Sequence, residues 1–183
     1  MVYRLIMLKD SPDKENISSI NNKTLVIRRG DEKDLNDFFE LYWISSLEHQ
    51  DYNEKFDTLK TKEECKKFII TRQKEFLNDK DQIFFVAEFD EKIVGVITGH
   101  IGKRDEAEVY IKENIGFINE LSVLPEYRKS GIGKKLIEKI LSELKQRKIE
   151  FVGVGAAYNN ATAIKIYKSY GFDLEGIWMV KKL

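Results

Sequence analysis

Between residues 115 and 145 the apolar pattern of the sequence changes from that of a β-strand to that of an α-helix, across a short loop with two glycines. Residues 115–124 form a mostly apolar run of strand length, whereas residues 133–145 carry apolar side chains at helical spacing. The loop between them contains Gly131 and Gly133. This segment predicts a strand–loop–helix unit, and therefore a fold in which a helix packs on a sheet.

The glycine loop is suited to binding a phosphate group. A loop of this kind directs several backbone N–H groups toward one point at the positive end of a helix. Glycine lets an anion approach the backbone because it has no side chain. The basic residues around the loop are Arg128, Lys129, Lys134 and Lys135. We therefore expect a phosphate or pyrophosphate as the ligand of this loop.

Two common phosphate-binding motifs do not fit. A Walker A loop requires glycine five residues before Gly133, where Arg128 stands, and Ser or Thr after Lys134, where the sequence has another lysine. A Rossmann fingerprint requires Gly or Ala three residues after Gly133, where Leu136 stands. The pattern that is present, Arg-x-x-Gly-x-Gly, begins just after a turn that contains Pro125.

The rest of the chain predicts a mixed α/β sheet. Strands are expected at 24–28, 82–89, 93–101, 115–124, 151–156, 172–174 and 177–181. Helices are expected after Asp31, after Thr61, at 133–145 and at 160–170, with an irregular stretch at 45–60. Asp31 is a plausible N-cap, and Thr61 with Glu64 forms a capping-box pattern. Gly171 suits the position after a helix C-terminus.

Composition and charge exclude several classes of protein. The 183 residues favour one domain, and 31 basic residues balance 31 acidic ones, so no nucleic-acid partner is expected. No apolar stretch approaches the ~20 residues of a membrane span, and the run at 5–8 is too short for a signal peptide. We therefore expect a cytoplasmic protein without a membrane partner. His49, His100 and Cys65 lack metal-ligand spacing, so no metal is expected.

Two longer motifs resemble the GNAT superfamily of acyl-CoA-dependent N-acetyltransferases. The first is Leu121-x-Val123-x-Pro125-x-x-Arg128-x-x-Gly131-Ile132-Gly133, and the second is Asn160-x-x-Ala163-x-x-x-Tyr167-x-x-x-Gly171-Phe172. The resemblance covers roughly residues 24–183 as a single N-acetyltransferase domain, and leaves 1–23 as an N-terminal extension. It implies an α/β fold with a mixed, mostly antiparallel central sheet, about four flanking helices, and strands that splay apart at the coenzyme-A site.

The resemblance also implies how acetyl-CoA, the cosubstrate, is bound. Backbone amides from about Lys129 to Lys134 would hold the pyrophosphate, and the pantetheine arm would lie beside the strand of Leu121 and Val123. Asn160 would contact the pantetheine or an ordered water, although from the residues alone it can also be a helix N-cap. The implied binding residues are Leu121, Ser122, Val123, Arg128, Lys129, Ser130, Gly131, Ile132, Gly133, Lys134, Asn160 and Tyr167.

Two residues are implied to be catalytic. Tyr167 would donate a proton to the departing thiolate, and Glu120 would accept one from the attacking amine. The backbone N–H of Val123 would polarise the acetyl carbonyl. From the residues alone, Tyr167 can also be a core aromatic. Glu120 can also bind the acceptor or be an ordinary polar position, and a chain of water molecules can remove the proton in its place. Strand alternation predicts that Glu120 faces the side opposite Asn119 and Leu121.

The acceptor is less constrained. An acidic stretch contains Glu48, Asp51, Glu54 and Asp57, and it would suit a cationic, polyamine-like acceptor. The alternatives are a solvated acidic loop, a protein N-terminus or lysine as the acceptor, and a non-catalytic acyl-CoA-binding module. Assembly into a homodimer also stays open.

Overall fold

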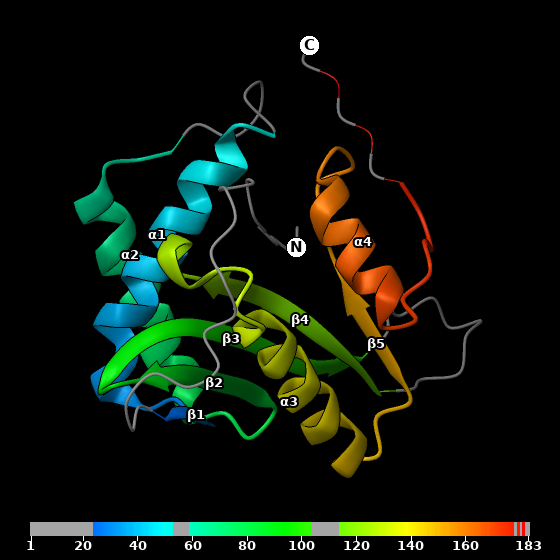
Figure 1. The fold of residues 1–183 in the computed structure, drawn as a ribbon, viewed down its shortest axis with the longest axis horizontal. Coiled ribbons are helices and arrows are strands. Elements are labelled where there is room, and N and C mark those ends of the chain that lie inside the picture. The colour runs from blue at the N-terminus through cyan, green and yellow to red at the C-terminus, as the bar shows by residue number, and fades with distance from the viewer. Residues whose placement is uncertain (1–23, 53–58, 104–113, 178, 180, 182–183) are drawn as a thin grey trace.

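A computed structural model describes residues 24–52, 59–103, 114–177, 179 and 181, and shows an open sheet with helices on both faces (Figure 1). The strands are β1 (Leu25–Arg29), β2 (Gln82–Phe89), β3 (Lys92–Lys103), β4 (Asn114–Val123) and β5 (Phe151–Val154). The helices are α1 (Leu35–Gln50), α2 (Lys62–Leu77), α3 (Ile132–Gln146) and α4 (Ala161–Ser169), with short 3₁₀ turns at Glu32–Asp34 and Pro125–Tyr127.

The five strands lie side by side in chain order and form a mixed sheet. β1 to β4 pair antiparallel, and β5 adds to β4 in parallel. The β4–β5 pairing runs only from Ile115 opposite Phe151 to Ile118 opposite Val154, while β4 continues to Val123. The two strands therefore separate after Ile118. The expected mixed, mostly antiparallel sheet with splayed strands is confirmed.

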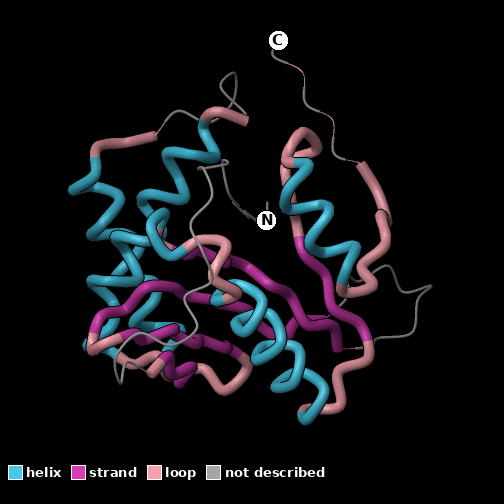
Figure 2. The backbone as a smooth tube through the Cα atoms, in the orientation of Figure 1, coloured by secondary structure: helices cyan, strands magenta, loops and turns pink. Residues whose placement is uncertain are grey.

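The two faces of the sheet are covered by different helices (Figure 2). α1 and α2 cover one face, where Phe38 and Leu41 pack with Phe84, Val86 and neighbouring side chains. α3 covers the other face, and its predicted apolar stripe is buried there with residues of β2, β3 and β4. The buried members of this stripe are Leu136, Ile137, Ile140 and Leu144. Burial of these two apolar layers holds the helices on the sheet.

Several local signals read from the sequence are confirmed. The Asp31 side chain caps the turn that precedes α1. Thr61 and Glu64 form both hydrogen bonds of a capping box at the start of α2. Asn160 is the N-cap of α4, and Gly171 follows that helix with a φ of 84°.

Three expectations about element bounds are wrong. α1 does not end before residue 45 but continues to Gln50, because its later turns bury polar side chains whose pattern does not resemble an apolar stripe. β5 ends at Val154 rather than at 156. The described residues of 172–181 form no strand, and Leu174, Ile177 and Met179 among them are exposed. Residues 178 and 180 of that segment, and the proposed extension 1–23, lie outside the described residues.

Gly99 provides a test of the packing between the sheet and α3. A Cβ at this position would lie 2.4 Å from the Phe117 carbonyl oxygen and 2.7 Å from Ile140 Cδ1. We expect Gly99→Ala to lower the free energy of unfolding by about 1–3 kcal/mol, because backbone cannot move aside cheaply. Urea denaturation measures this. Gly176→Ala is the control, since its Cβ would meet nothing within 4 Å; equal urea midpoints for the two variants would contradict the packing described.

Candidate functional site

The candidate site lies where β4 and β5 separate (Figure 1). The loop after β4 leads into α3 on one side of this separation, and the loop after β5 leads into α4 on the other. A cleft of about 640 Å³ lies between the glycine loop, the first turn of α3 and the last turn of α4. Its walls include Val123 from β4, Gly131 and Gly133 from the loop and first turn, and Tyr170 from the end of α4.

The glycine loop leaves room for a ligand at the N-terminus of α3. Gly131 is the N-cap of α3 with a φ of 85°, and a glycine has no side chain with which to cap the helix. The first N–H groups of a helix have no partner within it, so those of Ile132, Gly133 and Lys134 can bind an anion. A Cβ at Gly131 would meet no described atom within 4 Å, which indicates open space above the loop. This geometry fits the phosphate ligand expected from the sequence.

Arg128 lines this cleft, but its charge is already paired within the protein. Its Nε donates to the Val123 carbonyl oxygen at 3.0 Å, and its guanidinium forms an ion pair with Glu48 of α1, with a shortest N–O distance of 2.8 Å. The Arg128 side chain is 10% exposed, so this ion pair is largely removed from water. Arg128 therefore joins α1 to the end of β4. Glu48, expected in an acidic acceptor lining, is the partner that holds it.

Glu120 is buried on the side of the sheet that faces α1. It is 3% exposed, and its Oε1 accepts a hydrogen bond from Ser45 Oγ at 2.6 Å. Leu121 points the other way, into the core beneath α3, as strand alternation predicted. The expectation that Asn119 faces away from Glu120 is wrong. A β-bulge in β4 leaves Asn119 outside the pairing, because neighbouring residues of β3 pair with Ile118 and with Glu120.

The bulge brings Asn119 to the same face as Glu120. Asn119 Oδ1 lies 3.0 Å from Nδ1 of His100. His100 shares a face of β3 with Val96, which packs beneath α1, because side chains two and four residues apart point the same way. His100 also stacks on the ring of Phe117 at a centroid distance of 4.9 Å. An extra residue in one strand locally breaks alternation, which a pattern of period two cannot anticipate.

Tyr167 and Asn160 each carry a buried polar side-chain atom that the described part of the chain leaves unpaired. Tyr167 is 3% and Asn160 1% exposed, and neither Tyr167 Oη nor Asn160 Nδ2 has a hydrogen-bond partner among the described residues. The other side-chain atom of Asn160, Oδ1, accepts from the Ala163 N–H at 3.0 Å, so the N-cap role is real. Buried polar groups are nearly always paired, so these two atoms are positions at which a bound ligand or an ordered water would find a hydrogen-bond partner. Tyr167 is also a core aromatic, packed against Phe172.

The electrostatics of Tyr167 favour a neutral phenol. Burial raises the pKa of Tyr167 well above its ordinary value, and the negative charge of Glu120 raises it further. A buried carboxylate and a buried protonated phenol are thus within electrostatic reach of one another. Such a pair can accept a proton at one group and donate one at the other. Neither residue lines the 640 Å³ cleft, but Val123, which does, is on the same strand as Glu120.

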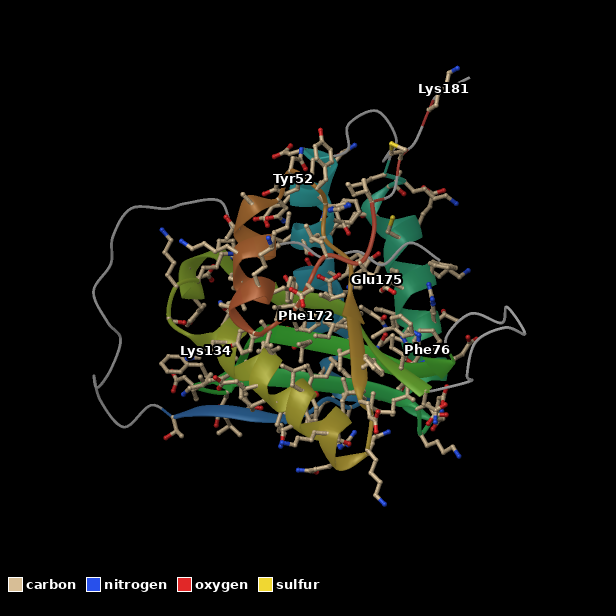
Figure 3. The ribbon with its side chains drawn as sticks, turned by 90° about the vertical axis from the view of Figure 1, so that its right-hand side faces the viewer. Tyr52, Phe76, Lys134, Phe172, Glu175 and Lys181 are labelled. Carbon is tan, nitrogen blue, oxygen red and sulfur yellow. The ribbon has the colours of Figure 1, made fainter. Side chains whose placement is uncertain are left out.

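The contact to Ser45 was missed by the sequence reading, since residues 45–60 were expected to be irregular. A second contact joins the end of α1 to another part of the fold: Asn159 Nδ2, in the loop before α4, lies 3.4 Å from the carbonyl oxygen of Tyr52, just after α1. Figure 3 labels Tyr52 at this end of α1 and Phe172 just after α4. Of the other acidic residues expected at the acceptor, Asp51 is the C-cap of α1. Glu54 and Asp57 lie outside the described residues.

The part of the chain that the structure describes bears on two further expectations, the membrane span and the metal site. No helix there is long and apolar enough to cross a membrane. No group of three or more His, Cys, Asp or Glu side chains is arranged there to hold a metal ion.

Comparison with known sequences gives consistent results. The sequence model of the acetyltransferase (GNAT) family matches residues 35–172. An uncharacterized N-acetyltransferase of Archaeoglobus fulgidus is 33% identical over 145 residues, which are 78% of this chain and 89% of the relative. An N-alpha-acetyltransferase of Sulfurisphaera tokodaii is 32% identical over 101 residues, covering 54% of this chain and 60% of the relative.

Solved structures share the fold. A mutant form of the BH1408 protein from Bacillus halodurans superposes with a TM-score of 0.74 at 19% identity, covering 86% of this chain and 99% of that protein. A predicted acetyltransferase from Clostridium acetobutylicum, solved with acetyl-CoA, has a TM-score of 0.68 at 17% identity, covering 87% and 96%. At these identities the likeness establishes the fold alone.

The ion pair between Arg128 and Glu48 gives a stability prediction. We expect Glu48→Gln to lower the free energy of unfolding by about 1.5–3 kcal/mol, because a largely buried guanidinium loses its counter-charge. Urea denaturation measures the loss. Glu126→Gln is the matched control: Glu126 pairs with Lys92 at 3.3 Å, but both side chains are more than half exposed. This variant should change the stability by no more than ~1 kcal/mol; an equal loss in both would show that burial of the Arg128 pair is unimportant.

Proposed function

Since this chain belongs to the acetyltransferase (GNAT) family and is an acyltransferase, we propose that it transfers an acetyl group from acetyl-CoA to a primary amine by direct attack. The observation that carries this proposal is the pair of buried atoms without a partner among the described residues, Tyr167 Oη and Asn160 Nδ2. Of these two residues, Tyr167 is also within electrostatic reach of Glu120. A fold neighbour solved with acetyl-CoA supports the choice of acyl donor.

The proposed binding residues divide into three groups. The loop amides from Lys129 to Lys134, including those of Ser130 and Ile132, hold the pyrophosphate at the N-terminus of α3. The backbone of Leu121, Ser122 and Val123 lines the separation of β4 from β5 and receives the pantetheine arm. Asn160 Nδ2 donates to this arm from the other side. Arg128 supports the site indirectly, because its guanidinium is engaged by Glu48.

The proposed chemistry uses Glu120 and Tyr167 as base and acid. Acetyl-CoA supplies an activated acetyl group whose carbon–sulfur bond breaks as the amine nitrogen bonds to the carbonyl carbon. Glu120 accepts the proton that the amine loses, and Tyr167 donates a proton to the departing sulfur, so the number of protons is conserved. When Glu120 takes up a proton it loses its negative charge, which had raised the pKa of Tyr167, so the pKa of Tyr167 falls. Proton uptake at one residue therefore favours proton release at the other.

Three classes of acceptor amine are candidates: a protein N-terminus, a lysine side chain and a polyamine. The polyamine hypothesis rested on four acidic residues, and Glu48 is held by Arg128, so its support is weaker than the sequence indicated. A relative that is 32% identical is named an N-alpha-acetyltransferase, which favours the α-amine of a peptide. We therefore place a peptide N-terminus ahead of a polyamine or a lysine side chain.

The free-energy cost of burying the Glu120 carboxylate argues against a non-catalytic acyl-CoA-binding module. Burying a carboxylate costs free energy even when it accepts a hydrogen bond, so a chemical role accounts for its presence better than stability does. A module that only bound acetyl-CoA would need the glycine loop, but it would not need a carboxylate buried against Ser45.

An amine panel tests the function and orders the acceptors. We expect thiol release from acetyl-CoA that depends on an added amine, with peptides bearing a free N-terminus as better acceptors than the same peptides with a blocked N-terminus. Spermidine and a peptide with a lysine but a blocked N-terminus complete the panel. Thiol release with spermidine, but with none of the peptides, would identify a polyamine as the acceptor. Binding of acetyl-CoA in calorimetry, with no release of its thiol in the presence of any amine of the panel, would support the non-catalytic module.

Tyr167→Phe tests the acid. We expect it to lower kcat by about a hundredfold or more while acetyl-CoA affinity changes little, because only the hydroxyl is removed. Gly131→Asp is the contrasting variant, since it adds a negative charge and a side chain at a φ of 85° where the pyrophosphate would lie; it should weaken acetyl-CoA binding in calorimetry. Full turnover by Tyr167→Phe would reduce this residue to its packing role.

A further inference from the structure

One face of α1 forms a line of polar contacts with β4 and the loop that follows it. Residues at spacings of four and three lie on one side of a helix, and Leu41, Ser45 and Glu48 have this spacing. The Leu41 carbonyl oxygen accepts from Ser122 Oγ at 3.1 Å, Ser45 Oγ donates to Glu120 Oε1, and Glu48 binds Arg128. We call these three contacts the polar seam.

The middle contact of the polar seam is the shortest of the three, and it is as deeply buried as the Leu41–Ser122 contact. Ser45 is 1% and Glu120 3% exposed, and their oxygens are 2.6 Å apart, the distance of a hydrogen bond to a charged acceptor. A serine hydroxyl has one hydrogen to donate, and here it is given to the carboxylate. The contact thus ties one oxygen of Glu120 to α1, and limits the rotation of a side chain that has several rotatable bonds.

We propose that Ser45 is a positioning residue, which holds the Glu120 carboxylate where β4 and β5 separate so that it can accept the proton of the acceptor amine. This inference rests on the proposed role of Glu120. Ser45 itself touches neither substrate, and it acts through Glu120. Base catalysis depends on geometry first, so a carboxylate that rotates away from the amine loses much of its effect.

The other two contacts of the polar seam make the proposal testable. The Leu41–Ser122 and Glu48–Arg128 contacts stay intact when the Ser45 hydroxyl is removed, and Phe38 and Leu41 still anchor α1 in the apolar layer. Ser45→Ala should therefore fold, so that a change in rate reports on Glu120 and not on the loss of the helix.

The experiment is a double-mutant cycle on thiol release with the best acceptor of the amine panel. We expect Ser45→Ala to lower kcat by about tenfold to a hundredfold, with the KM for acetyl-CoA within about twofold of the parent. In the Glu120→Gln background the same substitution should change kcat by less than about twofold, because there is no carboxylate left to position. Ser45→Thr, which keeps a hydroxyl, should be more active than Ser45→Ala. Thermal unfolding of each variant verifies that it is folded.

The outcomes separate the two proposals. If Glu120→Gln turns over like the parent, Glu120 is not the base, and both the assignment of the base and the inference about Ser45 are wrong. If Glu120→Gln is slow but Ser45→Ala is as fast as the parent, only the positioning role is wrong. The positioning role is also wrong if the effects of the two substitutions multiply independently, or if Ser45→Thr is as slow as Ser45→Ala.

Discussion

The unequal pairing of β4 with its two neighbours is the constraint on which the site depends. β3 pairs with β4 over its whole length, whereas β5 pairs only with residues 115–118. The first pairing keeps β4 in place, and the second leaves the edge of residues 119–123 without a neighbouring strand among the described residues. The backbone N–H and C=O groups at such a sheet edge lack hydrogen bonds to a neighbouring strand, and a ligand can form these hydrogen bonds instead. The glycine loop follows directly, so the N-terminus of α3 lies at the end of the same edge.

The attachment of α1 changes in character along the helix. Its first turns pack apolar side chains such as Phe38 against the sheet, while its later turns meet β4 through the polar seam. Burying polar groups contributes less to stability than burying apolar ones of similar size. The polar half lies against Glu120, at the point where β4 leaves β5. We therefore infer that this half of α1 is shaped by the chemistry of the site, and the first half by the needs of the core.

Burial and charge act together at the site. Tyr167 and Glu120 are both removed from water, so the charge of one affects the other more strongly than it would in solvent. The phenol stays protonated in the presence of a carboxylate, which is the state required of a proton donor. Asn160 contributes in a different way, since its Oδ1 is used in capping α4, while its Nδ2 meets no partner in the described part of the chain and can bind a ligand.

The sequence by itself determined the features that depend on near neighbours. Helical spacing, capping residues and the glycine loop predicted α2, α3, α4 and the anion-binding geometry, because these are set within a few residues of the chain. The tertiary structure alone decided the partners of Glu120 and Arg128. Ser45 lies 75 residues before Glu120, and Glu48 lies 80 residues before Arg128, so these pairs form only once α1 has docked on β4. The bulge at Asn119 and the exposed segment after α4 likewise depend on neighbouring strands, which no local pattern records.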